Sequence, residues 1–520
     1  MVHALGMVAL ALALASLVVS YLRWLRVAQR EHYLTGTTST FAKRWWGSSV
    51  ANSALLALGV AGALASLAYP VAAVGAAVAA GAGPIGLGIW GKTSRLAWTP
   101  RMKRLAATCA GATAIAVGAA SAAGADGAAS AAALCAIGAP LLVDCALWCT
   151  SPLEARLLAP FVRSARRRMA AVSPRVVAVT GSFGKTTTKG YIAHLLGGSF
   201  SVLATPASFN NAKGLATAVN QHLAPGTEVF VAEMGTYGAG EIRAMCEWVT
   251  PEVAVITAIG PVHLERMRSL ENIAEAKAEI LEKARFAVLN VDYPLLARLA
   301  GKAEAEGKAV WRCSSRRGAA EEGADVVVTS EDGKLRAQVA RTGTEVDVLF
   351  GAGPEVSPGN VACALAAALC LGAPSEVVCS RLDSLPGAEH RRSSEMSATG
   401  ACVIDDTYNS NPAGAEAALG LLSLVGAQSA KRVVVTPGMI ELGASQRQEN
   451  ERFAERAGQV ATELVVVGRT NAKALVEGAR RAGLPVQRVR DRAGALAWMS
   501  VHLGPGDAVL YENDLPDHYP

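Results

Sequence analysis

The first third of the chain contains a long stretch without a charged side chain. Between Trp45 and Gly91 there is no Lys, Arg, Asp or Glu, whereas charged residues are frequent after Glu154. A soluble domain needs charged side chains on its surface, so this part of the 520-residue chain is expected to lie in a membrane. The whole chain is long enough for roughly two to four domains.

Apolar runs in this third have roughly the length of membrane-spanning helices. We expect five spans, at about residues 5–22, 49–68, 71–90, 105–123 and 129–149. Basic clusters at 23–44, 92–104 and 156–168 then follow the first, third and fifth crossings. The positive-inside rule therefore places all three clusters in the cytoplasm. Four spans are the alternative, with the last segment packed as an interfacial or buried helix, because helices rich in Ala and Gly insert less readily.

Asp144 lies in the last of these apolar segments. A lone carboxylate inside a membrane span is by default a functional hint. Here its expected position near the cytoplasmic end predicts that it is solvated instead.

The composition also limits the classes of partner. Arg163, Arg166, Arg167 and Arg168 form a cluster without interleaved aromatic residues, and no known nucleic-acid-binding module accompanies it, so no nucleic-acid partner is expected. Its place after an apolar stretch suits a membrane-surface anchor. The ten cysteines are scattered without a Cys-x-x-Cys pair, so neither a disulfide framework nor a zinc ribbon is expected. The scattered cysteines therefore predict that the ligase part lies in a reducing compartment.

A glycine-rich loop follows the basic cluster. The β-branched run 175–179 is typical of a buried parallel strand, and a helical pattern continues through Leu196. The loop between them consists of Gly181, Ser182, Phe183, Gly184, Lys185, Thr186 and Thr187. Glycines let backbone N–H groups turn towards phosphates, and the following helix adds its dipole. Lys185 is placed to reach the outer phosphates and the Thr186 hydroxyl to bind Mg²⁺, so the loop predicts nucleotide binding.

This loop is shorter than the common nucleoside-triphosphatase loop, and from here the chain resembles the Mur ligases, most closely the D-alanyl-D-alanine-adding type. The matching segments, in order, are Thr205–Gly214 with Asn210 and Asn211, Val231–Gly235 with Glu233, Pro251–His263, Glu275–Ile280 with Lys277, and Val288–Asp292 with Asn290. The resemblance implies ATP as co-substrate, with Asn290 on the adenine side and Asn210 and Asn211 near substrate.

The resemblance also implies two Mg²⁺ sites. Phosphoryl transfer from ATP to a carboxylate brings several negative charges together, and metal ions neutralise them. Thr186 supplies one ligand, while Glu233 and His263 supply a second site. Lys277 matches the position that is carbamylated in many Mur ligases, where the new carboxylate helps to hold the second metal.

Two later segments extend the match. Leu385–Arg392 resembles the interdomain segment whose arginine contacts the γ-phosphate, which implies Arg391, with Arg392 as the alternative. Asp405–Pro412 resembles the Asp-Asp-Ser-Tyr-Asn-Ala-Asn-Pro signature. It implies that Asp406 orients the nucleotide or Lys185. The implied substrate residues of this segment are Tyr408, Asn409 and Asn411.

The chain also departs from the family. Gly359 and Cys363 replace the usual His and second Asn of one helix. The segment 511–520 is acidic where the resembled enzyme has a basic Lys-Gly-Ser-Arg element, which predicts an acceptor with an amine or guanidinium rather than a carboxylate. The family's soluble nucleotide-sugar-binding N-terminal domain is missing, and membrane spans take its place.

We therefore expect an α/β protein in three parts. Residues 1–155 form a transmembrane region of about five helices, 170–355 a Mur-ligase-like central P-loop ATPase domain, and 356–520 a Rossmann-like C-terminal domain. The expected function is an ATP-dependent ligase at the cytoplasmic face of the cell membrane. It would join an amino acid or dipeptide to a small-molecule or lipid-linked carboxylate, through an acyl phosphate, in cell-envelope synthesis. The alternatives are a polyglutamate- or secondary-metabolite-forming ligase and a membrane ATPase or scaffold without ligation.

Overall fold

The computed structural model divides into two units. It describes all residues except 1, 70, 92–94, 208, 332–333, 342–343, 352–355, 387–392, 398, 408–410, 426–430 and 516–517. The first, here called the helical unit, contains residues 1–157, 468–470 and 515–520. The second, here called the α/β unit, contains residues 158–467 and 471–514.

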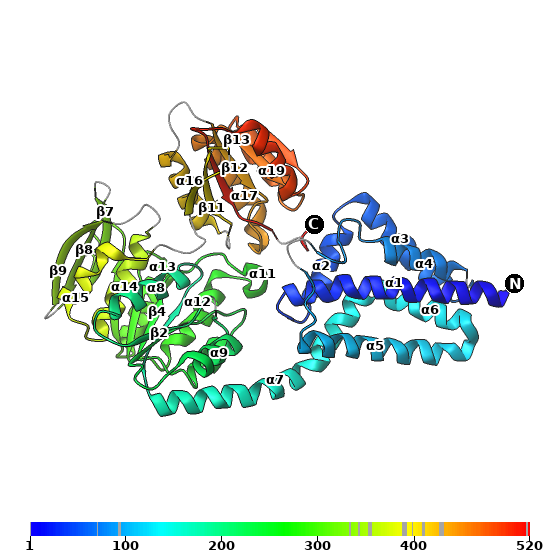
Figure 1. Cartoon of the computed structure of the whole chain (residues 1–520), viewed down its shortest axis with the longest axis horizontal. Coiled ribbons are helices and arrows are strands. Elements are labelled where there is room, and N and C mark those ends of the chain that lie inside the picture. Colours follow the sequence, from blue (N-terminus) through cyan, green and yellow to red (C-terminus); the bar gives the residue numbers. More distant parts are fainter. Residues whose placement is uncertain are drawn as a thin grey trace. The chain divides into compact units, whose positions relative to one another are not determined.

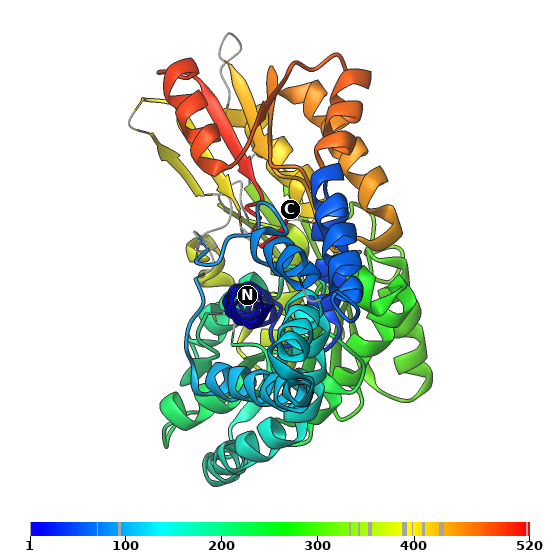
Figure 2. The same ribbon diagram turned by 90° about the vertical axis from the view of Figure 1, so that its right-hand side faces the viewer.

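The helical unit is built around a long N-terminal helix. Its helices are α1 (Val2–Arg30), α2 (Thr37–Trp46), α3 (Val50–Ala65), α4 (Ala72–Ala82), α5 (Pro100–Ala120), α6 (Gly124–Ile137) and the first half of α7 (Ala139–Val172). Helix α1 packs against α4 and α6, as the view along α1 in Figure 2 shows. The residues between these helices are mostly alanine, among them Ala13, Ala76 and Ala129. Such small side chains let helix backbones approach closely.

The apolar segments differ from the five expected spans. Two described segments are long and apolar enough to cross a membrane, Gly6–Arg30 and Pro100–Ile137, or three if the bent pair of α2 and α3 is one span. Helices α3 and α4, where two spans were expected, have 16 and 11 residues, and a perpendicular crossing needs about 20. Helix α4 ends at Ala82, and Gly83 and Pro84 follow; proline cannot continue the backbone hydrogen-bonding of a helix.

Asp144 is not solvated, contrary to the prediction. Its carboxylate accepts hydrogen bonds from the backbone N–H groups of Gly36, Thr38 and Ser39 at 3.0, 3.3 and 2.8 Å. These residues lie at the start of α2, where backbone donors have no partner within the helix. Asp144 therefore caps α2 from another helix, and its negative charge also suits the helix dipole.

The α/β unit contains two sheets, and the first has nine strands in the order β2-β3-β1-β4-β5-β6-β7-β8-β9 (Figure 1). The strands are β1 (Arg175–Thr180), β2 (Val202–Ala204), β3 (Val229–Glu233), β4 (Val253–Ile256), β5 (Phe286–Asn290), β6 (Ala309–Ser314), β7 (Val326–Glu331), β8 (Lys334–Arg341) and β9 (Thr344–Gly351). Pairing is parallel from β2 to β7, and β8 and β9 continue as antiparallel strands.

Helices cover both faces of the first sheet. Alternate residues of β1 show the two faces: Val177 and Val179 pack with α8 (Lys185–Leu196) and α14 (Pro358–Cys370). Val176 and Ala178 pack on the opposite side with the end of α7, α9 (Ala212–His222), α10 (Glu241–Cys246), α12 (Leu270–Ala278) and α13 (Pro294–Ala305). A strand buried on both faces requires a continuous apolar run, as 175–179 has. The core of this sheet extends past residue 355, because α14 belongs to it.

The second sheet has six strands in the order β10-β11-β15-β12-β13-β14. They are β10 (Ser393–Met396), β11 (Cys402–Asp406), β12 (Arg432–Thr436), β13 (Glu463–Val467), β14 (Val486–Val489) and β15 (Ala508–Glu512), and all but β10 pair in parallel. Helices α16 (Pro412–Val425), α17 (Gln446–Val460) and α18 (Ala472–Arg481) pack on one face, and α19 (Arg492–His502) on the other. This confirms the expected Rossmann-like arrangement.

Candidate active site

The glycine-rich loop connects β1 to α8, and two of its glycines are required by close contacts. Gly184 has a φ of +79°, and a Cβ atom added there would lie 2.5 Å from Oδ1 of Asn360. A Cβ atom added to Gly181 would lie 2.0 Å from Oγ1 of Thr257. The loop therefore takes this shape only with glycine at both positions.

Hydrogen bonds hold the loop against the end of β4. Ser182 donates its backbone N–H to the Ala258 carbonyl at 2.8 Å, and its Oγ is bonded to the N–H and carbonyl of Gly260 at 2.9 and 3.1 Å. The Thr257 hydroxyl donates to the Phe183 carbonyl at 2.5 Å. The Ser182 side chain thus fixes the turn.

Glu233, at the end of β3, links three other side chains beside the loop. One carboxylate oxygen accepts the Thr186 hydroxyl at 2.9 Å, and the other accepts the Asn210 amide at 3.1 Å. Lys189 lies 3.2 Å from the first oxygen and also donates to the Ala207 carbonyl at 2.6 Å. Glu233 is 1% exposed. The structure thus brings together three residues that the sequence singled out: Thr186, Glu233 and Asn210.

Lys189 was missed in the sequence. It lies one helical turn after Lys185 in α8, so both lysines share one side of the helix. That spacing is visible in the sequence, but a lysine in a helix is ordinarily expected to point into solvent. Here its side chain is 7% exposed and forms a buried ion pair.

Lys185 and Lys277 lie close enough for their charges to interact. The Lys185 ammonium donates to the carbonyls of Gly181 and Ser182 at 2.9 and 3.4 Å, so its side chain folds over the loop. Lys277 in α12 is 3% exposed. Burial, and next the positive charge of Lys185, hold the pKa of Lys277 well below its ordinary value.

His263 contacts a different set of residues. Its Nδ1 lies 2.5 Å from a carboxylate oxygen of Glu441, and its ring stacks edge-on against Tyr237 with centroids 5.0 Å apart. It precedes the short helix α11 (Leu264–Met267), and the Leu264 N–H donates to the Glu441 carbonyl at 2.9 Å. The described contacts of His263 are thus with Glu441 and Tyr237, whereas those of Glu233 are with the loop and its surroundings.

The donor set beside the loop fits magnesium. Within the described part of the chain, no three His, Cys, Asp or Glu side chains gather closely enough to hold a metal ion by themselves. Mg²⁺ in nucleotide sites takes only one or two protein carboxylates and otherwise binds water and phosphate oxygens. The hydroxyl of Thr186 and the carboxylate of Glu233, 2.9 Å apart, are oxygen donors of this kind. A site with phosphate oxygens as further ligands is therefore compatible with these residues.

Asn290 ends β5 in a tight polar surrounding. Its side-chain oxygen accepts the Asp292 N–H at 3.2 Å, and Asp292 in turn accepts the Ser315 N–H at 2.8 Å. A Cβ atom added to Gly359 would lie 2.9 Å from the Asn290 amide nitrogen. Glycine at residue 359 therefore leaves room for the Asn290 side chain.

Two asparagines expected near substrate cap helices. The side-chain oxygen of Asn211 accepts the Gly214 N–H at 2.9 Å at the start of α9. That of Asn411 accepts the Gly414 N–H at 3.0 Å in the same way for α16. Each bond satisfies a backbone N–H group at the start of a helix, so helix capping accounts for an asparagine at both positions. The contacts of the two residues with substrate stay predictions.

Asp406 ends β11 opposite a residue that the sequence did not single out. Asp406 pairs with Glu512 of β15, whose side chain is fully buried and accepts the Thr436 hydroxyl at 2.6 Å. Burial raises the pKa of Glu512 to about 8, and the negative charge of Asp406 adds to this effect. Of the remaining predicted residues, Arg391, its alternative Arg392, Tyr408 and Asn409 lie outside the described residues.

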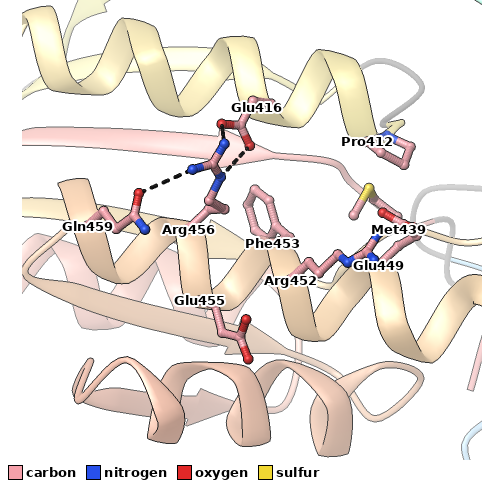
Figure 3. Close-up of a pocket in the computed structure, with 9 residues that line it drawn as sticks. All are labelled: Pro412, Glu416, Met439, Glu449, Arg452, Phe453, Glu455, Arg456 and Gln459. Carbon is pink, nitrogen blue, oxygen red and sulfur yellow. Dashed lines mark hydrogen bonds and ion pairs between the residues drawn. The ribbon is translucent and has the colours of Figure 1, made fainter.

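A groove of about 330 Å³ lies beside the same segment of the second sheet. Figure 3 shows it between α16 and α17, with the Arg456 guanidinium held by Glu416 at 2.8 Å on one side and Phe453 between the helices. Pro412, the last residue of the Asp405–Pro412 segment, is one of the residues that line the groove. Its mixed charges suit a small polar molecule better than an apolar one.

Comparisons with known proteins agree with this geometry. Residues 179–370 match the Mur ligase middle domain, and residues 391–511 match the family described as Mur ligase, glutamate ligase domain. The chain is similar to the UDP-N-acetylmuramoyl-tripeptide--D-alanyl-D-alanine ligase of Mycobacterium tuberculosis, with 30% identity over 376 residues, or 68% of this chain and 73% of that one. It is 32% identical over 294 residues to the Bacillus subtilis enzyme of the same name, covering 55% and 60% of the two chains.

Solved structures show the same similarity. The crystal structure of MurF from Acinetobacter baumannii matches with a TM-score of 0.59 and 26% identity, covering 68% of this chain and 77% of that one. MurF ligase from Thermotoga maritima, in complex with ADP, matches with a TM-score of 0.57 and 25% identity over 69% and 80% of the two chains.

Proposed function

The chain belongs to the Mur ligase family of ATP-dependent acid–amino-acid ligases, and we propose that it forms its amide bond at the cytoplasmic face of a membrane, in cell-envelope synthesis. The observation that carries the chemistry is the contact of Glu233 with Thr186 directly beside the phosphate loop. The apolar helices of the helical unit support the membrane location.

The proposed reaction has two steps. A substrate carboxylate oxygen attacks the terminal phosphorus of ATP, which releases ADP and forms an acyl phosphate. The acceptor amine then attacks the acyl carbon, so that phosphate leaves, the amine loses a proton and the amide remains. Exclusion of water protects the acyl phosphate between the two steps.

Seven of the predicted residues have a role in this scheme. Lys185 and Arg391 stabilise the negative charge of the phosphoryl group during transfer, and Asp406 orients the nucleotide or Lys185. Thr186 and Glu233 hold Mg²⁺, which supplies charge neutralisation. Glu233 with His263 would supply a second metal site, which a carbamylated Lys277 would help to hold. The deep burial of Lys277 supports this, because a desolvated lysine is more readily neutral and only the neutral amine reacts with CO₂.

We infer the substrates by class. The similar enzymes are named for UDP-N-acetylmuramoyl-tripeptide and D-alanyl-D-alanine. The family match begins at residue 179, after the helical unit. A lipid-linked or muramoyl-type carboxylate and an amino acid or dipeptide acceptor therefore suit this chain. The basic clusters between its apolar segments support a cytoplasmic position of the ligase domains.

The function is tested with the full chain in lipid nanodiscs. ADP release is measured with a panel of carboxylates and amines, and the products are identified by mass spectrometry. We expect sustained ADP release only when both substrates are present, and none from Lys185→Ala, whereas Lys334→Ala on the exposed part of β8 behaves as wild type. Steady ADP release without an amine would favour the ATPase alternative. Glutamate as the sole productive acceptor would favour the polyglutamate alternative.

A further inference from the structure

The end of the chain does not continue the second sheet. Strand β15 ends at Glu512, and residues 515–520 are part of the helical unit instead. In Figure 1 the C-terminus lies beside α2. This is the acidic segment that, by resemblance, was expected to act on the acceptor side.

His518 and Tyr519 contact α2 and the residue that follows α1. The Trp45 indole donates to the His518 carbonyl at 2.8 Å, and Nε2 of His518 lies 3.0 Å from a carboxylate oxygen of Glu31. The Tyr519 ring packs edge-on against Phe41 with centroids 4.8 Å apart. One hydrogen bond from an indole to a backbone carbonyl, one carboxylate contact and one aromatic pair thus hold two consecutive residues of the tail.

The contact is buried on both sides. His518 is 2% exposed and Tyr519 9%, while Phe41 and Trp45 are 3% and 5% exposed. Chain termini ordinarily fray because ordering them costs conformational entropy without enough contacts in return. Burial of two aromatic residues on α2 against two residues of the tail supplies such contacts.

A second segment joins the same contact. The hydroxyl of Thr470 donates to the carbonyl oxygen of Pro520. Residues 468–470, which follow β13, are grouped with the helical unit as the tail is. Two segments that follow strands of the second sheet, 468–470 and 515–520, therefore belong to the helical unit. The tail is hydrogen-bonded to both α2 and Thr470.

We propose that the α1–α2 junction is a docking site for the chain's own C-terminal His518-Tyr519-Pro520, and that this contact tethers the C-terminal ligase domain to the helical unit. The covalent link is short, because only residues 513–517 separate β15 from His518. A docked tail therefore limits how far the last strand of the second sheet can travel. The tail acts as a structural tether rather than as a charge partner of the acceptor.

Hydrogen–deuterium exchange of the full chain in lipid nanodiscs tests the tether. We expect slow exchange in α2 and at His518 and Tyr519 in the wild type. Tyr519→Ala should raise exchange in α2, and Phe41→Ala should raise exchange in the tail, each at least about tenfold. Trp45→Phe, which keeps an aromatic ring and removes only the indole donor, should give a smaller rise in both segments. Lys43→Ala, exposed on the same helix, is the matched control and should change neither segment.

The proposal requires that a substitution in the tail changes exchange in α2 and that a substitution in α2 changes exchange in the tail. Fast exchange of the tail in the wild type, or a Phe41→Ala effect confined to α2, would overturn the proposal. If Phe41→Ala also raises exchange in α4 and α6, the packing of the helical unit is damaged, and Trp45→Phe then decides: a rise in tail exchange supports the tether and wild-type exchange overturns it. Because the measurement needs no substrate, its result is independent of the ligase assignment.

Discussion

At the scale of single residues, the buried pair of Lys189 and Glu233 connects the phosphate loop to the segment that carries Asn210. We expect Lys189→Ala to lower kcat/KM by about 10- to 100-fold and to raise the Mg²⁺ concentration for half-maximal rate, because Lys189 orients the carboxylate that holds the metal. Steady-state kinetics across a Mg²⁺ titration measures both. Lys213→Ala, exposed on α9, is the control, and indistinguishable Mg²⁺ curves for the two variants would refute the role.

Glu512 predicts a pH dependence of stability. Burial raises its pKa from 4.5 to about 8, so between these values the folded protein holds a proton that the unfolded chain has lost. The unfolded state then binds fewer protons, and the free energy of unfolding falls as pH rises through this window. Glu512→Gln removes the titrating group. Thermal unfolding in nanodiscs should therefore show a Tm that falls from about pH 6 to about pH 8 in the wild type and falls less in the variant.

The control for this pH series is Glu321→Gln at an exposed position, which should keep the wild-type slope. Equal slopes in wild type and Glu512→Gln would show that Glu512 titrates normally in the folded protein.

Some of these residues could be predicted and others could not, for a physical reason. Thr186, Glu233 and Asn210 belong to segments whose order is readable in the sequence, and they do meet. Lys189 and Glu512 have no local pattern that marks them. Their burial depends on which strand ends and loops lie next to them, and single-sequence patterns carry no such long-range information. Asp144 was misjudged for the same reason, since the helix that it caps begins about a hundred residues earlier.

At the scale of elements, the loop between β1 and α8 depends on glycine at residue 184. Gly184→Ala forces a side chain into the left-handed region, which costs about 1–2 kcal/mol, and pushes its Cβ against Asn360. We expect this variant to lose most of its ATP affinity, measured by calorimetry on the full chain in nanodiscs. Gly190→Ala in the same helix is the matched control, because open space surrounds that position.

For Gly190→Ala we expect unchanged ATP affinity and, if anything, a more stable helix by roughly 0.5–1 kcal/mol. Wild-type ATP affinity in Gly184→Ala would mean that the loop tolerates a side chain. It would also show that the close approach of Asn360 to Gly184 is not needed for ATP binding.

The ends of helices and strands could be predicted where a single sequence pattern marks the element. The strand 175–179 and the helix after the loop match β1 and α8, because a β-branched run, a glycine-rich loop and a helical pattern can each be recognised from neighbouring residues alone. The apolar block between Trp45 and Gly91 was harder, since hydropathy alone does not locate helix ends. The bend of 114° between α2 and α3 lies at the start of this block, beside the expected start of the second span at about residue 49.

At the scale of the whole molecule, motif order predicted two ligase domains after an apolar region, and both sheets are present. The destination of the tail was not predictable, because the Trp45–His518 bond joins residues 473 positions apart. The acidic composition of residues 511–520 suggested an electrostatic role towards the acceptor. The structure instead buries His518 and Tyr519 through aromatic packing and hydrogen bonds.

The basic clusters predict how the chain is oriented in the membrane. If the N-terminus lies outside and the ligase domains inside, the number of crossings is odd. Two long apolar segments and one bent pair give three crossings, but these would leave the basic cluster 92–104 outside, so this set of three does not place every basic cluster in the cytoplasm. Protease protection measures this with an N-terminal epitope tag on the full chain. In intact spheroplasts the tag should be digested while the α/β unit is protected, and in inverted vesicles the pattern should reverse. Protection of both, or digestion of both, in the same preparation would require an even number of crossings, and the basic clusters could then not all be cytoplasmic.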